Sequence, residues 1–305
     1  MNGRVRLVRA PVERRSSIAT RQLALGELDP ASPWCQRWTE SKTPSWRHRS
    51  EGGFDADRYG VAALSEAPAK QFILTHHYSG SYPAARLRYG MWDLAASKPE
   101  IVGVAVLSVP TSRATLTNAF PDLDPYVQSL ELGRFVLTES VPANGESWFL
   151  AQAFRLAAAE GIRGVVSFAD PRPRLTLGGD IVFPGHLGII YMASNCLYAG
   201  RTTPRTLTML PDATVLSERA MAKVRNQERG HGYVERQLIQ YGAAPRHPDH
   251  DPADWLNQQL PAIGARRIRH DGKHRYLIRL GNRAQRTRTR IGLATRSYPR
   301  QLDPI

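Results

Sequence analysis

The feature of this sequence that most limits its fold is an unbroken apolar run at residues 101–109, IVGVAVLSV. Such a run is stable in water only when both of its faces are covered, so it predicts a buried strand in the middle of a sheet. Residues 130–137 and 164–168 also read as strands, and residues 147–160 between them place apolar side chains at helical spacing, with Gly161 as the stop. This alternation predicts an α/β fold.

Shorter patterns predict the remaining elements. Strands are expected at residues 71–76, 84–92 and 205–210, and a basic helix at residues 217–225. The segment 185–200 is expected to end in a short helix that Gly200 closes. Arg86 and Arg88 alternate along the second strand and are expected to point outward.

The charge balance points to a polyanionic partner. The chain carries 41 Lys and Arg against 27 Asp and Glu, which gives a formal charge of +14. Clustered cations gain affinity for nucleic acid by releasing the counterions condensed on its phosphates. Charge by itself does not separate DNA from RNA.

Cysteine usage and hydropathy exclude several classes of protein. Cys35 and Cys196 are too few and too far apart for a disulfide framework or a four-ligand zinc site, which fits a reducing compartment. No apolar signal core is present, and no stretch approaches the roughly 20 apolar residues that span a bilayer. We therefore expect a cytoplasmic protein with no membrane partner.

Both ends of the chain are basic. Residues 1–66 are expected to form a partly irregular arm, since the first fifty hold ten Lys and Arg against four acids, together with Trp34, Trp38 and Trp46. Two readings stay open for this arm: a solvated terminus, or a segment that lies along phosphates with Trp as a stacking surface. Residues 247–305 are expected to form a basic β extension, because KHRYLIRL alternates as a half-buried strand does.

The cations of the C-terminal segment form the predicted DNA-contacting set. Between residues 266 and 300 there are twelve Lys and Arg and one acid, a density that favours a phosphate-binding hairpin over a generic basic surface. The set consists of Arg266, Arg267, Arg269, Lys273, Arg275 and Arg279, with Arg86 and Arg88 from the core.

Five motifs in one order carry a resemblance to a known family. HHYSGSYP, ELGRFVL, PANGESWFLAQAF, VVSFADP and GHLGIIYMASN lie within residues 67–246, the predicted catalytic core. In these motifs the chain resembles the Mom family of phage DNA-modification proteins, distant relatives of the GNAT acyltransferases. The resemblance implies a GNAT-like mixed central sheet, flanked by helices and splayed between two central strands. It also implies conversion of adenine N6 in double-stranded DNA to a carbamoylmethyl derivative that protects the DNA from restriction.

The sequence departs from ordinary GNAT enzymes before the helix at residue 147. Those enzymes hold the coenzyme A pyrophosphate with a Gly-rich turn, and here that place holds VPANGES, with one glycine and the acid Glu146. Glu146 would repel a phosphate, which argues against acetyl-CoA as the donor. The donor is then a small molecule that the sequence does not identify. An acetyl-CoA-dependent N-acetyltransferase and a non-catalytic DNA-binding accessory protein stay open as alternatives.

Three residues are candidates for the chemistry at the amine. Asp170 ends a strand at a Pro-rich loop, where it could accept a proton from N6, hold the amine, or simply close a turn. Tyr78 and Tyr191 could stack on a flipped base or protonate a leaving group, and either could instead be a core tyrosine.

Two further residues could bind the donor. Arg134 interrupts an apolar strand, where an unpaired guanidinium is costly to bury, so it is expected either to face the cleft and bind a carboxylate or phosphate or to pair with Glu131. Ser147 could cap the helix that follows it, and the resemblance includes it in the site.

His76, His77 and Asp170 suggest a two-histidine, one-carboxylate iron site. On a regular strand the two histidines point to opposite faces, so only one could join Asp170 and a tyrosine at an iron ion. The same rule places His76 and Tyr78 on one face as the cleft-facing pair. His186 is a further candidate, although a histidine in a loop is more often exposed.

Overall fold

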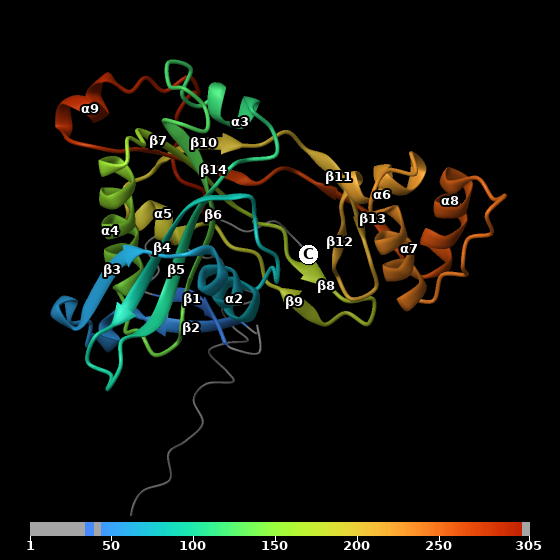
Figure 1. Cartoon of the computed structure of the whole chain (residues 1–305), viewed down its shortest axis with the longest axis horizontal. Helices are drawn as coiled ribbons and strands as arrows, with labels where there is room; N and C mark the ends of the chain where they lie inside the picture. Colours follow the sequence, from blue (N-terminus) through green and yellow to red (C-terminus); the bar gives the residue numbers. More distant parts are fainter. Residues whose placement is uncertain (1–33, 40–43, 301–305) are drawn as a thin grey trace, which may run out of the picture.

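The computed structural model describes residues 34–39 and 44–300, and its centre is a seven-stranded mixed sheet (Figure 1). The strand order is β10-β14-β7-β6-β5-β4-β3, and every neighbouring pair is antiparallel except β6 with β7. The strands are β3 (Tyr59–Ala63), β4 (Ala85–Asp93), β5 (Glu100–Ser108), β6 (Ser129–Leu137), β7 (Gly164–Ala169), β10 (Leu197–Arg201) and β14 (His274–Arg279). The predicted α/β class, with a mixed central sheet flanked by helices, is confirmed.

The apolar run of residues 101–109 forms the buried strand β5. Residues 102–108 are all buried, because each face of the sheet carries a helix. On one face, α2 (Glu66–His76) packs through Ala69 and Ile73 against Val104 and Val106. On the other face, α4 (Gly145–Ala159) contributes Phe149, Leu150 and Ala153 to the main core. The predicted helix at residues 147–160 is therefore confirmed, and it begins two residues earlier.

The parallel strands β6 and β7 separate soon after they meet. They pair only from Ser129 with Gly164 to Glu131 with Val166, and beyond this point the two strands diverge. This is the splay that a GNAT-like core implies. Because backbone groups there no longer bond across the sheet, side chains from both strands can border a shared space.

The predicted strand at residues 71–76 is wrong, since these residues are the second half of α2. Six apolar-rich residues do not distinguish a strand from a helix by periodicity. The deciding signal lies upstream: Ser65 is the N-cap, Glu66 is in the first turn, and Pro68 follows near the helix start. Ala69 and Ile73, four residues apart, then form the buried stripe.

The prediction for residues 185–200 is also corrected. The short helix, α5 (Ile189–Ala193), lies earlier than expected, and Gly200 belongs to strand β10. Gly200 has a positive φ of 73° at a register shift between β10 and β14, so it serves a β-bulge and not a helix stop.

The basic C-terminal hairpin is not observed, because its two strands join different sheets. β13 (Arg266–His270) pairs with β11 (Arg205–Met209) in a three-stranded sheet that β12 (Val215–Leu216) completes. β14 instead lies between β7 and β10 inside the central sheet. Gly272 permits the change of sheet: it has a φ of 99°, and an added Cβ would collide with the backbone of Thr202. The strand β14 is thus an integral part of the central sheet.

The chain between β10 and β14 forms a second unit with its own core. Helices α6 (Glu218–Arg225), α7 (His231–Gln240) and α8 (Pro252–Ala262) pack together beside the three-stranded sheet, at one end of the molecule (Figure 1). The predicted basic helix is α6, capped by the Ser217 hydroxyl, which accepts from the Ala220 amide at 3.1 Å. α9 (Arg283–Arg288) lies at the opposite end (Figure 1), and α3 (Ala114–Thr117) contacts β6.

Part of the expected N-terminal arm is a regular hairpin. β1 (Trp34–Trp38) and β2 (Pro44–His48) pair in antiparallel register, and β3 adds an edge strand to the central sheet. The expectation for residues 1–33 lies outside the described residues. Two short strands, β8 (Arg174–Leu175) and β9 (Ile181–Phe183), form a hairpin between the central sheet and the second unit. No helix in the described ranges combines the length and apolarity that crossing a membrane needs.

The place of β14 inside the core gives a stability prediction. Leu277 is fully buried on this strand, so Leu277→Ala is expected to lower the free energy of unfolding by about 2–5 kcal/mol. Leu177→Ala, at a side chain that is 58% exposed, is the matched control and should change it by less than about 0.5 kcal/mol. Urea unfolding followed by circular dichroism measures both. Equal, small effects would show that β14 is peripheral.

Candidate active site

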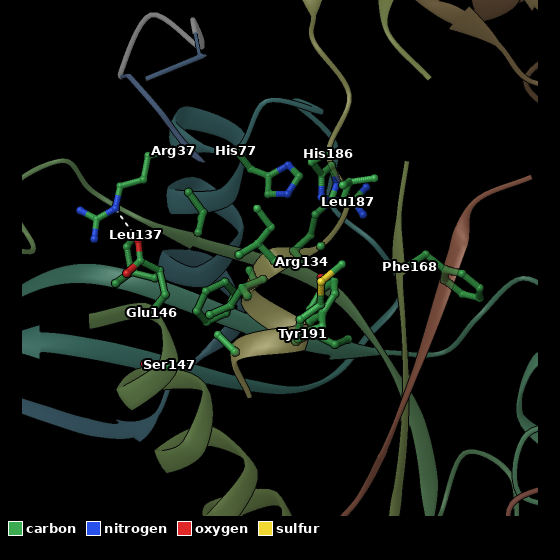
Figure 2. Close-up of a pocket in the computed structure, with 18 of the residues that line it drawn as sticks. Arg37, His77, Arg134, Leu137, Glu146, Ser147, Phe168, His186, Leu187 and Tyr191 are labelled. Atoms are coloured by element: carbon green, nitrogen blue, oxygen red, sulfur yellow. Dashed lines mark hydrogen bonds and ion pairs between the residues drawn. The ribbon is translucent and has the colours of Figure 1, made fainter. Parts of the chain in front are cut away.

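A cavity of about 590 Å³ lies where β6 and β7 diverge (Figure 2). Its wall is built from β6, the first turn of α4, the end of α2 and the loop that leads into α5. Its size falls within the range of small-molecule sites. Five of the predicted catalytic and metal-binding residues line it, namely Tyr78, Tyr191, Arg134, Ser147 and His77. Glu131, His186 and Lys273 line it as well.

Tyr78 enters the cavity from the end of α2. The neighbouring ring of His77 stacks on it at 4.4 Å, and Phe183 of β9 stacks at 5.1 Å. Burial raises the pKa of Tyr78. The charge of Arg174 acts to lower this pKa, and the charge of Asp170 acts to raise it. The phenol is therefore protonated at neutral pH.

The expected pairing of His76 with Tyr78 is wrong, because it assumed a strand. His76 is the last residue of α2 and its ring lies 4.4 Å from that of Phe72, one helical turn back. His77 is the C-cap with extended backbone, and its buried ring is the one that lines the cavity.

Tyr191 lies on α5, held by a close approach at Gly188. Gly188 has a φ of 78°, and a Cβ there would come within 2.7 Å of the Tyr191 ring and 2.9 Å of the Tyr276 ring. Only glycine fits this position. Burial raises the pKa of Tyr191, and the Tyr78 hydroxyl adds to the shift, so the two phenols share one environment.

A β-bulge on β6 decides which charged groups share a face of the sheet. Between β5 and β6 the register shifts, so that Leu107 pairs with Leu132 while Val106 pairs with Arg134. The extra residue, Gly133, reverses the alternation of side chains. Arg134 and Val136 therefore lie on the same side as Glu131, while Leu132 and Leu137 face the main core.

Arg134 does not pair directly with Glu131. Its guanidinium donates to the Ser81 carbonyl at 2.9 Å, to the Ser81 hydroxyl at 2.7 Å and to the Gly133 carbonyl at 2.5 Å. The loop after α2 thus fixes the guanidinium. Arginine has five N–H donors, so part of the fork remains for a ligand.

Three cavity groups were missed or misread from the sequence. Burial raises the pKa of Glu131, whose carboxylate makes no hydrogen bond to another side chain or backbone group within the described residues. Lys273, expected at a DNA surface, lines the cavity instead, and burial lowers its pKa. His186, expected to be exposed, also lines it, and burial lowers its pKa to about 4, which keeps the ring neutral. The alternation of ELGRFVL could have indicated Glu131, but no local signal marked His186.

Asp170 lies buried behind the cavity wall and does not line it. Its carboxylate accepts from His270 at 2.9 Å, from Arg174 at 3.1 Å and from the Arg172 amide at 3.2 Å. Burial acts to raise its pKa, but the hydrogen bond with His270 and the charges of Arg174 and Lys273 outweigh burial and lower it well below the usual range. A carboxylate held in this way is a poor proton acceptor, so the geometry favours a positioning role over the expected general base.

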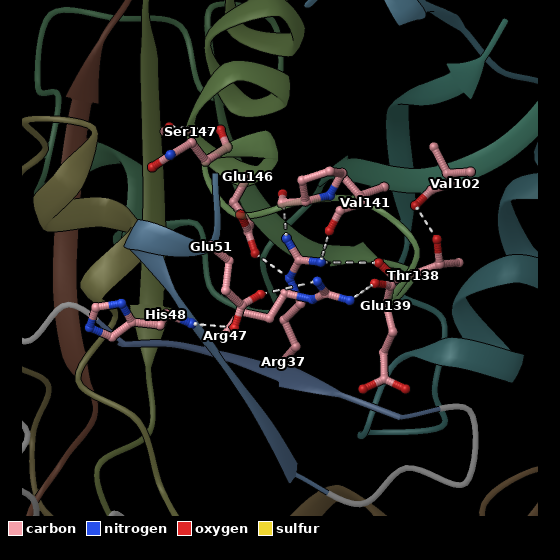
Figure 3. Close-up of polar contacts among 12 residues, drawn as sticks. Arg37, Arg47, His48, Glu51, Val102, Thr138, Glu139, Val141, Glu146 and Ser147 are labelled. Atoms are coloured by element: carbon pink, nitrogen blue, oxygen red, sulfur yellow. Dashed lines mark hydrogen bonds and ion pairs between the residues drawn. The ribbon is translucent and has the colours of Figure 1, made fainter. Parts of the chain in front are cut away.

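The first turn of α4 carries an internal ion pair. Arg37 of β1 donates to Glu146 at 2.5 Å and to three carbonyls of the loop before the helix, those of Thr138, Val141 and Pro142 (Figure 3). The charge of Glu146 is thus already neutralised. Ser147 is not the helix cap, since Asn144 takes that position and the Ser147 hydroxyl donates to the Asn144 carbonyl at 3.1 Å.

Neither of the two cofactors considered from the sequence, coenzyme A and iron, fits the residues present. A coenzyme A pyrophosphate would need free donors at the first turn of α4, where the nearby cation Arg37 is fully engaged and Glu146 is a carboxylate. For iron, no group of three or more His, Cys, Asp and Glu in the described residues could hold a metal ion. His76 packs on α2 and Asp170 is bound by cations, so the suggested iron ligands are not brought together.

The predicted DNA-contacting set is distributed over several surfaces. Arg86, Arg267 and Arg269 are exposed, but they lie on β4 and β13, in different sheets. Arg266 donates to the Leu175 carbonyl, and Arg88 donates to the Leu64 carbonyl and pairs with Glu66. Arg275 and Arg279 are half-buried on β14. The structure therefore gives internal partners to Arg266 and Arg88 and leaves Arg86, Arg267 and Arg269 exposed.

Comparison with known proteins gives two findings. The model of the Mom protein family matches residues 58–300. A tandem GNAT protein from the clavulanic acid biosynthesis pathway, solved without acetyl-CoA, aligns over 73% of this chain and 99% of its own, at 9% identity and a TM-score of 0.37. The search of curated proteins gave no match. The family match spans most of the sequence and includes every motif noted above, and the chain therefore belongs to the Mom protein family of phage DNA-modification proteins.

Proposed function

We propose that this protein converts adenine N6 in double-stranded DNA to its carbamoylmethyl derivative and so protects phage DNA from restriction. One observation carries the proposal: the cavity between the diverging strands gathers two protonated tyrosines, a neutral histidine, a carboxylate and an arginine. Such a set suits a flat, uncharged heterocycle with one amine to be activated. Family membership supplies DNA as the substrate class.

The target base must leave the duplex to reach this cavity. Tyr78, His77 and Phe183 form a stack of aromatic rings beside it, and a purine can extend such a stack. Tyr191 and neutral His186 then offer hydrogen bonds to ring nitrogens. The free energy of unstacking, about a few kcal/mol, is offset by these contacts.

Glu131 is the proposed proton acceptor. The adenine amine attacks the methylene carbon of a small-molecule donor that carries a carbamoylmethyl group; the N–C bond forms and the bond from that carbon to the donor's leaving group breaks. The leaving group departs with the bonding electron pair, and the N6 proton passes to Glu131. Arg134, beside Glu131 on the same face of β6, holds the carboxamide oxygen of the donor with its remaining N–H groups.

Nucleoside analysis of DNA tests the proposal. Cells that express the full chain are grown, their DNA is digested, and the nucleosides are separated and weighed by mass spectrometry. Carbamoylmethyl-deoxyadenosine supports the proposal. Acetylated nucleoside would indicate an acetyltransferase instead, and unmodified DNA that the protein nevertheless binds would indicate a DNA-binding accessory protein.

Removal of the proposed base gives a prediction on rate. Glu131→Gln should reduce the modified fraction of adenine by about 100-fold or more, because general-base catalysis is lost while the shape of the cavity is kept. Glu100→Gln, at an exposed position on β5, is the matched control and should leave modification unchanged. Retention of full modification by the Glu131 variant would remove this residue from the mechanism.

The state of Glu131 can be measured directly. Since burial raises its pKa, its carboxyl group should titrate above the ordinary value of 4.5. Carboxyl ¹³C NMR over a pH series, with Glu131→Gln used to assign the signal, gives this value. The ionised form accepts the proton, so activity should fall as the pH falls through it.

Asp170→Asn tests the positioning role of the buried carboxylate. The substitution removes the charge that holds His270 and Arg174 behind the cavity, and displacement of the wall by about 1 Å is expected to lower modification about 100-fold. Affinity for duplex DNA, measured by fluorescence anisotropy, should be unchanged. If binding is lost together with modification, the carboxylate supports the whole fold and not the cavity.

A further inference from the structure

The second unit, between β10 and β14, takes no part in the chemistry proposed above. We propose that its helix α7 lies in the major groove of duplex DNA and reads the base pairs beside the target adenine, an inference that rests on the proposed function for its choice of DNA as partner. Four residues of one exposed face would make the contacts: Tyr233, Arg236, Gln237 and Gln240.

The connectivity around α7 is that of a helix-turn-helix. α6 and α7 are joined by residues 226–230, where Gln227 and Gly230 have positive φ angles of 49° and 91° that turn the chain sharply. The two helices pack together through Met221 and Val224 of α6 and Val234 of α7. In this motif the second helix enters the major groove.

A third helix supports α7 from behind. Trp255 and Leu256 of α8 are buried against the same core as Leu238 of α7. With Val234 and Leu238 turned inward, the opposite face of α7 is left to solvent (Figure 1). Ten residues of helix are about 15 Å long, which suits a groove about 12 Å wide.

The exposed face has the chemistry of base readout. Tyr233 is 67% exposed, Arg236 and Gln240 are exposed, and Gln237 lies between them at helical spacing. Arginine pairs with guanine through two hydrogen bonds and glutamine with adenine in the same way. The tyrosine hydroxyl suits a phosphate oxygen at the groove edge.

The charges around this face suit a polyanion. Each nearby carboxylate is already engaged: Glu235 by Arg246 at 3.1 Å, Glu228 by Arg219 at 2.6 Å and Asp212 by the Tyr241 hydroxyl at 2.6 Å. Arg236 and Arg229, in contrast, have no polar partner within the described part of the chain. The face therefore presents free cations and no free anion, which favours duplex DNA over a basic or neutral protein partner.

The second unit is fixed to the cavity and not merely tethered to it. His270, at the end of β13, bonds to Asp170 behind the cavity, and Arg266 donates to the Leu175 carbonyl of β8 at 2.8 Å. The β8–β9 hairpin also supplies Phe183, which stacks on Tyr78. Because the spacing between α7 and the cavity is fixed, the base pairs that α7 contacts lie at a constant distance along the DNA from the modified adenine.

The test selects preferred sequences from a pool of random DNA duplexes with the full-length protein. The wild type should enrich a short sequence. Arg236→Ala and Gln237→Ala should each relax the preference by about tenfold at a different base pair, while binding to unselected duplex stays within about threefold. Arg155→Ala on the exposed side of α4 and Gln258→Ala on the exposed side of α8 are the matched controls and should leave the enriched sequence unchanged. Circular dichroism checks that the variants are folded.

Several outcomes would overturn this inference. The wild type could enrich no sequence, both α7 variants could keep the wild-type preference, or the protein could bind only single-stranded DNA. Nucleoside analysis of the same strains separates this inference from the proposed function. Modified adenine with no change of context in the α7 variants contradicts the role of α7 alone, whereas an enriched sequence without modified adenine contradicts the chemistry alone.

Discussion

The short pairing between β6 and β7 is the constraint on which the rest of the structure depends. Three residue pairs hold the two halves of the sheet together, and the strands then part. The gap cannot be left dry and empty with unpaired backbone groups, so α5, the end of α2 and the first turn of α4 border it with side chains. The site is therefore a consequence of sheet topology, and its chemistry depends on which side chains the strands direct there.

Charge inside this site is balanced locally. Asp170 is compensated by His270 and Arg174, and Glu146 by Arg37, while Glu131 and Lys273 act on each other across the cavity without direct contact. Burying an unpaired charge is costly, so the compensated groups are structural and the incompletely compensated ones are available for chemistry. Asp170, the more buried carboxylate, is held by hydrogen bonds, whereas Glu131 is not, and Glu131 is therefore the proposed proton acceptor.

Strongly basic composition does not by itself locate an interface with DNA. Of the arginines expected in one basic hairpin, Arg266 donates to a backbone carbonyl, and Arg275 and Arg279 lie on β14 inside the central sheet. The face for which we propose base readout is on α7, whose sequence HGYVERQLIQ holds only one arginine. The net charge of a protein indicates the class of its partner. The surface that binds this partner depends on which cations have no partner within the protein.

The sequence by itself determined the elements whose patterns are long and local: β5, β6, β7, α4 and the basic helix α6, together with the family and five of the residues that line the cavity. Predictions from the sequence were wrong where the apolar pattern was too short to distinguish a strand from a helix, as at residues 71–76. They were also wrong where a strand pairs with a partner far away in the chain, as β13 and β14 do. Only the tertiary structure decided that Glu131 and Arg134 share a face, because that depends on a bulge at Gly133 set by pairing with β5. The tertiary structure likewise decided that the Asp170 carboxylate has hydrogen-bond partners while the Glu131 carboxylate has none within the described residues. The partner His270 lies 100 positions from Asp170 in the chain, so the local sequence does not indicate this contact.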